Sequence, residues 1–305
     1  MICQRLLRVF YYFIKIYFMK NFLNTLKINI LYFFRLIKEN FCYNGKIDND
    51  IVIDFKDDFK VMTFNLRRDV PGDAENNWQY RRDAVVEAII KYAPDVICFQ
   101  ECMPTMAKYL IYRLSKYYDN AGVEIFTNRE MRKCNLVFGE GLLTMWRKDL
   151  FDFDYKKVIK LFDGRNINLR RMMDVNLIDK STGKDIHIIN THFCYISKEA
   201  QNKSFAVLKN YVKDFERFYA AGDYNTDKSY RNTDINLMMN DYSCNYKKKP
   251  SDTTICGWGK KTNTGEVIDY IFSNNTLNDF DIIYDKINDK YLTDHYPVIN
   301  TYKTK

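Results

Sequence analysis

Short apolar runs and longer mixed segments alternate along the chain from about residue 58 onward. Apolar runs bounded by turn residues predict strands at 60–66, 95–101, 136–146, 171–178, 185–193, 219–223, 267–272, 281–284 and 298–302. Segments with helical spacing of apolar residues predict helices at 78–92, 105–117, 198–218 and 230–239. Ser181-Thr-Gly183 predicts a hairpin turn. Because hairpins and helical crossovers both occur, the pattern predicts an α/β fold with two mixed sheets packed face to face and helices outside.

Residues 1–45 differ from this pattern, because they are both apolar and basic. Their longest uncharged stretch, residues 28–34, is too short for a transmembrane helix, and charges interrupt every candidate signal-peptide core. The basic residues fall on two arcs, which predicts two short amphipathic helices with a break near residues 21–24. Three interpretations stay open: an anchor on an anionic membrane surface, a helix that covers an apolar patch, and an over-long start with Met19 as the initiator.

Composition indicates a globular protein with a large core. Hydrophobic residues make up 47% of the 305 positions and charged residues 28%, and no Ser-, Gly- or Pro-rich run divides the chain. After the segment 1–45, this composition leaves open one large domain or two small ones. The eight cysteines include no Cys-x-x-Cys pair and are typical of reduced core residues. This favours a cytoplasmic protein, with membrane association through residues 1–45 as the open addition.

The net charge is concentrated at one end of the chain. Of the formal charge of +8, residues 1–41 carry seven basic and one acidic residue, so the other 264 positions carry +2. A nearly neutral body lacks the overall basicity of a high-affinity nucleic-acid binder, although a local basic patch stays open.

Polar residues stand at the ends of several predicted strands, where a purely structural strand would not need them. One carboxylate, Asp269, lies inside an otherwise apolar strand, where its burial is costly unless it is paired or bound to a metal. The strand-end residues are Asn65, Gln100, Glu101, Asn190, His192, Asp223, Asn225, Asp294 and His295. We expect them to form one site at the edge of a sheet.

These residue types suit metal-assisted hydrolysis of a phosphoester. Glu101, Asp294 and Asn65 offer the oxygen ligands that a hard cation such as Mg²⁺ prefers, with Mn²⁺ as an alternative. Asp223 is the candidate base for a water molecule, and Asn225 the amide that orients this water.

Histidine is scarce, with three residues in the chain. His192 and His295 can stabilise transition-state charge, and Asp269 can hold one of them protonated. His187, in the middle of a predicted strand, is interpreted as a structural residue.

Six ordered motifs resemble the endonuclease/exonuclease/phosphatase superfamily, which includes deoxyribonuclease I, exonuclease III, neutral sphingomyelinases and inositol-polyphosphate 5-phosphatases. The motifs are Thr-Phe-Asn65-Leu-Arg, Asp95-Val-Ile-Cys-Phe-Gln-Glu101, Asn190-Thr-His192, Gly222-Asp223-Tyr-Asn225, Ile268-Asp269-Tyr-Ile-Phe and Asp294-His295-Tyr-Pro297. They span about residues 58–303. Asn77-Trp78-x-x-Arg81, after Pro71-Gly-Asp73, further resembles a bacterial branch whose substrates are mostly unassigned.

The resemblance implies a four-layer α/β/β/α sandwich with the site at one end of both sheets. By matching position, it implies that Asn65, Glu101 and Asp294 hold the metal. It also implies that Asp223 and Asn225 activate and orient water, while His192 and His295 bind and stabilise the phosphoryl group and Asp269 pairs with His295.

The resemblance further implies a phosphate-binding set. Asn190 belongs to it, and so does an arginine before the Asn-Thr-His motif, a position that Arg170 and Arg171 fit equally well.

Two departures from the family pattern leave the metal and water residues untouched, and the first of them puts in doubt any substrate contact made there. Phe193-Cys194-Tyr195 stands where many relatives continue with a hydrophobic residue, Asp and His. Gly141-Leu-Leu-Thr-Met-Trp146 replaces an Asn-Ala-Ile-Leu-Ser-Arg run.

The leading hypothesis is a Mg²⁺-dependent phosphoester hydrolase, a phosphodiesterase of nuclease type. The alternative within the class is a phospholipid or phosphoinositide hydrolase, so the substrate is nucleic acid or a phospholipid head group. The alternative of another class is a catalytically silent scaffold that binds phosphate. The sequence implies no protein partner.

Overall fold

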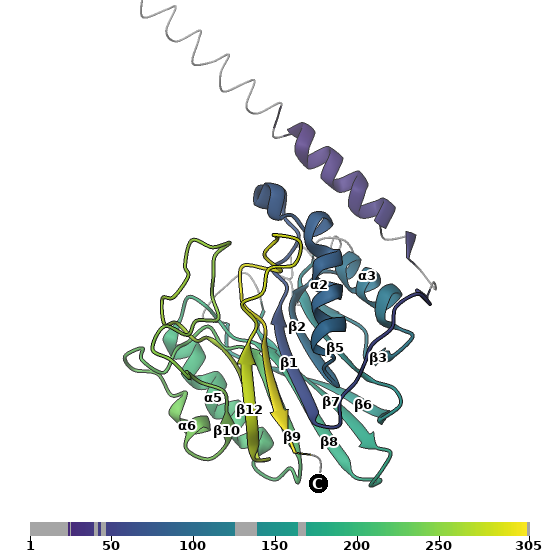
Figure 1. The fold of residues 1–305 in the computed structure, drawn as a ribbon. Helices are drawn as coiled ribbons and strands as arrows, with labels where there is room; N and C mark the ends of the chain where they lie inside the picture. Colours follow the sequence, from purple (N-terminus) through teal and green to yellow (C-terminus); the bar gives the residue numbers. More distant parts are fainter. Residues whose placement is uncertain are drawn as a thin grey trace, which may run out of the picture.

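Two mixed β-sheets pack face to face, and helices cover the outer face of each sheet (Figure 1). The computed structural model describes residues 24, 26–39, 42–43, 47–125, 139–163 and 169–303 of the chain. The predicted four-layer α/β/β/α sandwich is confirmed.

The first sheet contains seven strands around a parallel pair. In spatial order they are β12 (Leu277–Ile282), β13 (Val298–Tyr302), β1 (Phe59–Asn65), β2 (Val96–Cys102), β5 (Gly141–Arg147) and β3 (Tyr118–Asn120), with β4 (Glu124–Ile125) also paired to β5. β1 and β2 are parallel, and the other pairs are antiparallel. Since parallel neighbours end at the same edge of a sheet, Asn65 and Glu101 come to one end.

The second sheet contains six strands, again with one parallel pair. In spatial order they are β10 (Ser243–Cys244), β11 (Asp269–Ser273), β9 (Phe218–Asp223), β8 (Asp185–His192), β7 (Arg171–Asp179) and β6 (Phe151–Lys160). Here β8 and β9 are the parallel pair, with His192 directly opposite Asp223. The carboxyl ends of the two parallel pairs therefore carry Asn65, Glu101, His192 and Asp223.

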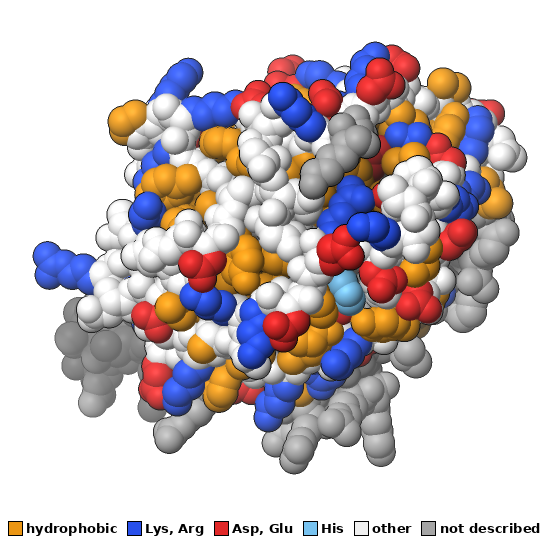
Figure 2. All heavy atoms as spheres, turned by 90° about the horizontal axis from the view of Figure 1, so that it is seen from below, with side chains coloured by type: hydrophobic (Ala, Val, Ile, Leu, Met, Phe, Trp, Pro, Cys, Tyr) orange, Lys and Arg blue, Asp and Glu red, His pale blue; other side chains and the backbone are white. Residues whose placement is uncertain are grey.

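Three apolar layers hold the sandwich together. Side chains from β1, β2, β5, β7, β8, β9 and β11 fill the space between the sheets. α2 (Trp78–Tyr92) and α3 (Pro104–Leu114) pack on the first sheet, and α5 (Lys198–Val212) and α6 (Asn236–Met239) on the second. A 3-10 helix, η1 (Pro71–Asn76), precedes α2. On the face seen in Figure 2, acidic and basic side chains are interspersed, as the low net charge of the body predicts.

Most predicted elements are present, with boundaries that differ by a few residues. α2 has the predicted bounds, and β7 and β8 form the predicted hairpin. The long helix predicted at 198–218 ends at Val212, because the chain turns there before β9. Residues 136–138 of one predicted strand lie outside the described residues, and the strand itself runs over β5.

One predicted helix was wrong and one long edge strand was not predicted, both for identifiable reasons. The helix predicted at 230–239 is reduced to α6, because side chains bind the main chain in the preceding turns. Asp227 Oδ1 accepts from the main chain of Ser229 at 2.7 Å, which competes with helix formation. β6 was not predicted, because this edge strand alternates charged and aromatic residues and has no apolar run.

The N-terminal segment contains a helix over residues 26–39, seen in purple at the upper end of Figure 1. The first predicted helix and most of the predicted break at 21–24 lie outside the described residues. Within the described part of the chain, no helix is long and apolar enough to cross a bilayer.

Candidate active site

Asp223, the last residue of β9, lies at the centre of a polar group where the two sheets end. Its Oδ2 atom is 2.9 Å from Nδ2 of Asn65 and 3.5 Å from Nε2 of His192. Nε2 of His295 lies 3.9 Å from the same oxygen. Asp269 stands directly opposite Asp223 in the β9–β11 pairing. Residues from β1, β8, β9, β11 and the loop before β13 therefore meet at one carboxylate.

Gly222 explains how β8 and β9 come so close at this point. A Cβ atom on Gly222 would lie 2.2 Å from the main-chain oxygen of Thr191. A larger residue would push the strands apart, so glycine before Asp223 is required by the close approach of the two backbones.

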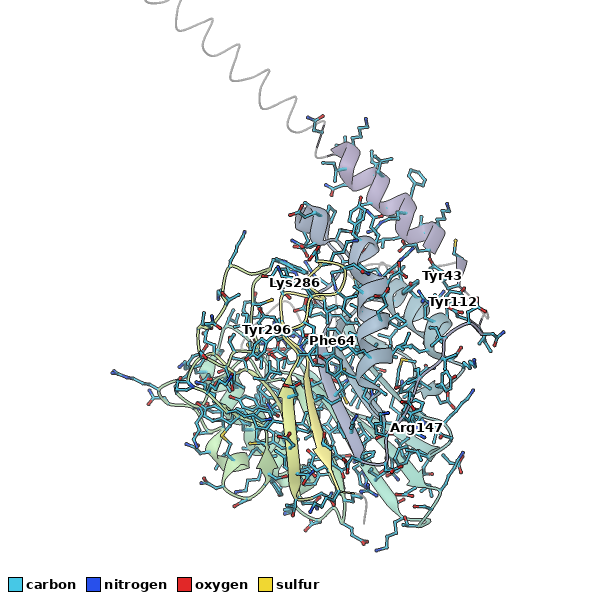
Figure 3. The ribbon with its side chains drawn as sticks, in the orientation of Figure 1. Tyr43, Phe64, Tyr112, Arg147, Lys286 and Tyr296 are labelled. Atoms are coloured by element: carbon cyan, nitrogen blue, oxygen red, sulfur yellow. The ribbon has the colours of Figure 1, made fainter. Side chains whose placement is uncertain are left out.

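Asp269 and His295 form a buried pair. Nδ1 of His295 is 3.0 Å from Oδ2 of Asp269, and both side chains are almost completely shielded from solvent. Burial alone would lower the pKa of His295, but Asp269, followed by Asp223 and Asp294, outweighs it and raises this pKa well above its usual value. Figure 3 labels Tyr296, the next residue, and Phe64, which precedes Asn65; both lie at this end of the sheets.

The pKa of the second imidazole, that of His192, is shifted in the opposite direction. Burial, then the charges of Arg170 and His295, lowers the pKa of His192 well below its usual value. Burial, then Asp269, raises the pKa of Asp223 to about 7, against the opposing effect of His295. The two imidazoles that face the Asp223 carboxylate therefore have opposite pKa shifts, downward for His192 and upward for His295.

The structure distinguishes the two candidate arginines. Arg170 is buried beside His192 and Glu140 in a small cavity that also contains Glu101. The Nε atom of Arg170 is buried without a hydrogen-bond partner among the described residues. Because buried donors are normally hydrogen-bonded, this atom is suited to bind an anionic ligand. The Arg171 side chain points toward the first sheet, where its Nη1 atom lies 3.9 Å from Oε1 of Glu124 on β4.

Carboxylates crowd the side of the site next to Asn65. Nδ2 of Asn65 is 3.4 Å from Oε1 of Glu101, and Arg67 Nε is 3.8 Å from Oδ2 of Asp294. Burial, with a further contribution from Glu101, raises the pKa of Asp294. Burial, then Glu101, raises the pKa of Glu140 to about 7. Partly buried carboxylates that repel one another fit a divalent cation, which would neutralise them with the oxygen ligands it prefers.

A second group of potential ligand atoms consists of Asp223, Asp269 and His295, which lie within 4.8 Å of one another. Nδ1 of His295 is already bonded to Asp269, so this nitrogen is occupied, and a hard cation prefers carboxylate oxygens to an imidazole. We therefore favour the Glu101 and Asp294 side for the cation and regard this second group as a proton-holding cluster.

The backbone at the site adopts conformations that side chains seldom accept. Arg67, Glu101 and Asn225 have φ values of 51°, 53° and 51°, in the left-handed region. Such conformations cost free energy and cluster at functional sites, where the surrounding structure enforces them.

Arg81 holds the loops of the site from behind. Its guanidinium donates to the main-chain oxygens of Arg67, Leu292 and Asn76 at 2.6, 3.0 and 2.9 Å. It also lies over the ring of Trp78. Burial lowers its pKa to about 10. One fully buried side chain thus ties the loop after Asn65 to the loop before Asp294.

Two predicted site residues have other contacts than the sequence suggested. Asn190 is completely buried between the sheets, where its amide bonds to the main chain of Phe99 and Leu143 and to Gln100. These contacts link the two sheets, and the predicted phosphate-binding role of Asn190 stays a prediction. Asn225 uses Nδ2 to donate to Phe193, and its main-chain N–H donates to Asp223 Oδ1 at 2.8 Å.

Sequence reasoning assigned no role to Glu140, Arg67 or Arg81, which the structure brings to the site. Arg67 and Arg81 stand within quoted motifs and could have been considered. Glu140 lies inside the strand predicted at 136–146, between two glycines, and no motif distinguished it. A larger cavity, about 700 Å³, lies between helix 26–39 and η1 and contains none of the predicted site residues.

Comparison with known proteins identifies the family. The profile of the Endonuclease/Exonuclease/phosphatase family matches residues 62–295, which is more than half of the chain. The chain therefore belongs to this family and is by that membership a phosphoric ester hydrolase.

Individual relatives are distant. An uncharacterized protein, L388 of Acanthamoeba polyphaga mimivirus, is 23% identical over 79% of this chain and 98% of its own. An endonuclease/exonuclease/phosphatase from Bacteroides vulgatus has 24% identity and a TM-score of 0.69 over 82% of this chain and all of its own. A mannosyl-6-phosphatase of Bacteroides thetaiotaomicron has 19% identity and a TM-score of 0.66 over 79% and 98%. At these identities the solved structures establish the fold alone.

Proposed function

We propose that this protein is a phosphodiesterase of nuclease type, dependent on a divalent cation, with Mg²⁺ as the expected ion. The convergence of His192, His295 and Asn65 on Asp223 carries the proposal. A carboxylate held between two imidazoles can accept a proton from water while positive charge stays beside the phosphoryl oxygens.

The residues of the chain would share the reaction as follows. Asp223 takes the proton as the water oxygen bonds to phosphorus and the bond to the leaving oxygen breaks. His295, kept protonated by Asp269, and neutral His192 donate hydrogen bonds to the phosphoryl group, together with Arg170. The main-chain N–H of Asn225 keeps Asp223 in place.

Glu101 and Asp294 would hold the cation, with Asn65 beside Glu101 as the third member of the set. When bound, the cation would neutralise charge on a phosphoryl oxygen.

One contact favours a base-containing substrate. Tyr195 is 60% exposed, and its ring centroid lies 5.9 Å from the guanidinium carbon of Arg170. An exposed aromatic ring beside a phosphate-binding arginine offers a stacking surface for a nucleobase. A phospholipid hydrolase is the second candidate, favoured by the exposed apolar residues of helix 26–39 at the same end of the sheets (Figure 1).

An activity screen tests the proposal. The full chain, with Mg²⁺ or Mn²⁺, is offered single- and double-stranded DNA, RNA, sphingomyelin, inositol phosphates and sugar phosphates. We expect hydrolysis of a nucleic acid that stops with EDTA and is lost in Asp223→Asn. Activity that survives EDTA would overturn the metal mechanism. A folded, Mg²⁺-supplied sample that hydrolyses none of these substrates would support a phosphate-binding scaffold.

A further inference from the structure

Helix 26–39 has one face that attaches it to the catalytic domain. Positions 32, 35, 36 and 39 share this face, because an α-helix turns about 100° per residue. The Tyr32 hydroxyl donates to the main-chain oxygen of Asp69, and Arg35 binds the Asp69 carboxylate at 2.5 Å. Leu36 is completely buried, and Glu39 pairs with Arg82 at 3.2 Å. The orientation of the helix on the domain is thus fixed by specific contacts.

The opposite face of the helix is apolar and exposed. Leu26, Ile30 and Phe34 follow one another at intervals of four residues, which places them in one row. They are 44%, 47% and 63% exposed. Large side chains in a contiguous exposed row are typical of an interaction site. We call these three residues the apolar row.

The positive charge around the apolar row indicates which kind of surface binds it. Lys27 and Lys38 lie along one flank of the row by their helical positions, and in the sequence residues 1–41 carry seven basic residues against one acidic residue. A second copy of the same positive segment would be repelled. A surface rich in anionic phospholipid would be attracted, and the apolar row would enter the boundary between head groups and acyl chains.

We propose that the apolar row docks this protein on an anionic phospholipid membrane. The helix lies at the same end of the sheets as the candidate active site, as Figure 1 shows, and its anchor residue Asp69 follows Asn65 by four positions. Docking would therefore hold the site close to the membrane surface. This surface is independent of the proposed hydrolysis, and its test measures binding.

Vesicle sedimentation with the full chain tests the docking. One set of vesicles contains phosphatidylcholine alone, and a second contains phosphatidylcholine with phosphatidylserine. We expect binding to the anionic vesicles to be at least about tenfold tighter, given the charge of the segment. The variant Ile30→Glu/Phe34→Glu should lose at least about tenfold of that binding, because carboxylates cannot enter the acyl boundary.

Two further variants make the test specific. Val52→Glu is the matched control, because Val52 is 71% exposed and lies outside the helix; its binding should be unchanged. Lys27→Glu/Lys38→Glu should reduce the preference for anionic vesicles. Circular dichroism would show that each variant is folded.

Several outcomes would overturn the docking. Equal binding by Ile30→Glu/Phe34→Glu and the unchanged chain would exclude the apolar row. Equal binding to neutral and anionic vesicles would remove the argument from charge. A dimer in solution that the same double variant dissociates, with no vesicle binding by the unchanged chain, would assign the row to a second copy.

Discussion

Two buried histidine–aspartate pairs have the same inner geometry: His187 of β8 with Asp174 of β7, and His295, before β13, with Asp269 of β11. His187 Nδ1 is 3.0 Å from Asp174 Oδ2, and His295 Nδ1 is 3.0 Å from Asp269 Oδ2. The surroundings differ. The ring of His187 stacks on Phe215, with centroids 3.6 Å apart and planes at 4°. His295 instead directs Nε2 toward Asp223.

The comparison teaches that such a pair does not by itself indicate catalysis. Around His187, aromatic rings occupy the space that a substrate would need, and the Tyr211 hydroxyl donates to Asp174 at 2.8 Å. Around His295, the neighbours are carboxylates that can exchange protons or bind a cation. In both pairs Nδ1 binds the aspartate, so the group that faces Nε2 distinguishes a structural pair from a functional one.

Asp269→Asn should show the largest effect. An amide cannot hold the His295 imidazole positively charged, so we expect kcat to fall on the order of 10³- to 10⁴-fold while the fold is kept. Steady-state kinetics on the substrate found in the screen would measure it. If Asp174→Asn lowered kcat as far, the distinction between the two pairs would be wrong.

The candidate active site also contains a second imidazole, His192, with the guanidinium of Arg170 next to it. Arg170→Ala should reduce kcat about 10²-fold, as expected when one donor to a developing anion is removed. Arg171→Ala, the adjacent control, should stay within about twofold, because Arg171 is turned toward Glu124. Kinetics of the two variants in parallel would test the assignment, and the reverse ranking would contradict it.

Asp174→Asn should affect stability and leave catalysis unchanged. The variant weakens charge-assisted hydrogen bonds to His187 and Tyr211 in a buried setting, so we expect a loss of about 1.5–3 kcal/mol in the free energy of unfolding. Urea denaturation would measure this loss. A normal stability together with a large fall in kcat would show that the His187 pair also serves the reaction.

The sequence predicted which strands end in polar residues, and these strand ends do meet. It could not predict where along a strand the edge of the sheet falls. Asn190 and His192 are two positions apart and share one face of β8, yet Asn190 lies in the core and His192 at the edge. The way in which the two sheets pack on each other decides that Asn190 is in the core and His192 at the edge.

The choice between two adjacent residues could not be made from the sequence either. Arg170 and Arg171 fit the same motif position, and side chains alternate between the two faces of a strand, so the choice depends on the face that meets the site. Likewise, the Asp174–His187 pair joins two strands of a hairpin, and its existence depends on the pairing register. Sequence patterns identify strands and their ends, whereas packing decides which of their polar residues meet.

Tyr211→Phe should produce the smallest effect and sharpens the comparison furthest. The change removes one hydroxyl that donates to Asp174 and keeps the ring that packs on Phe215. We expect a loss of about 0.5–1.5 kcal/mol in unfolding free energy, the value of one hydrogen bond. In Asp174→Asn the same change should cost less, because its acceptor is already weakened, and a double-mutant cycle measures that difference. Strictly additive losses would show that the Tyr211 hydroxyl and the Asp174 carboxylate act independently.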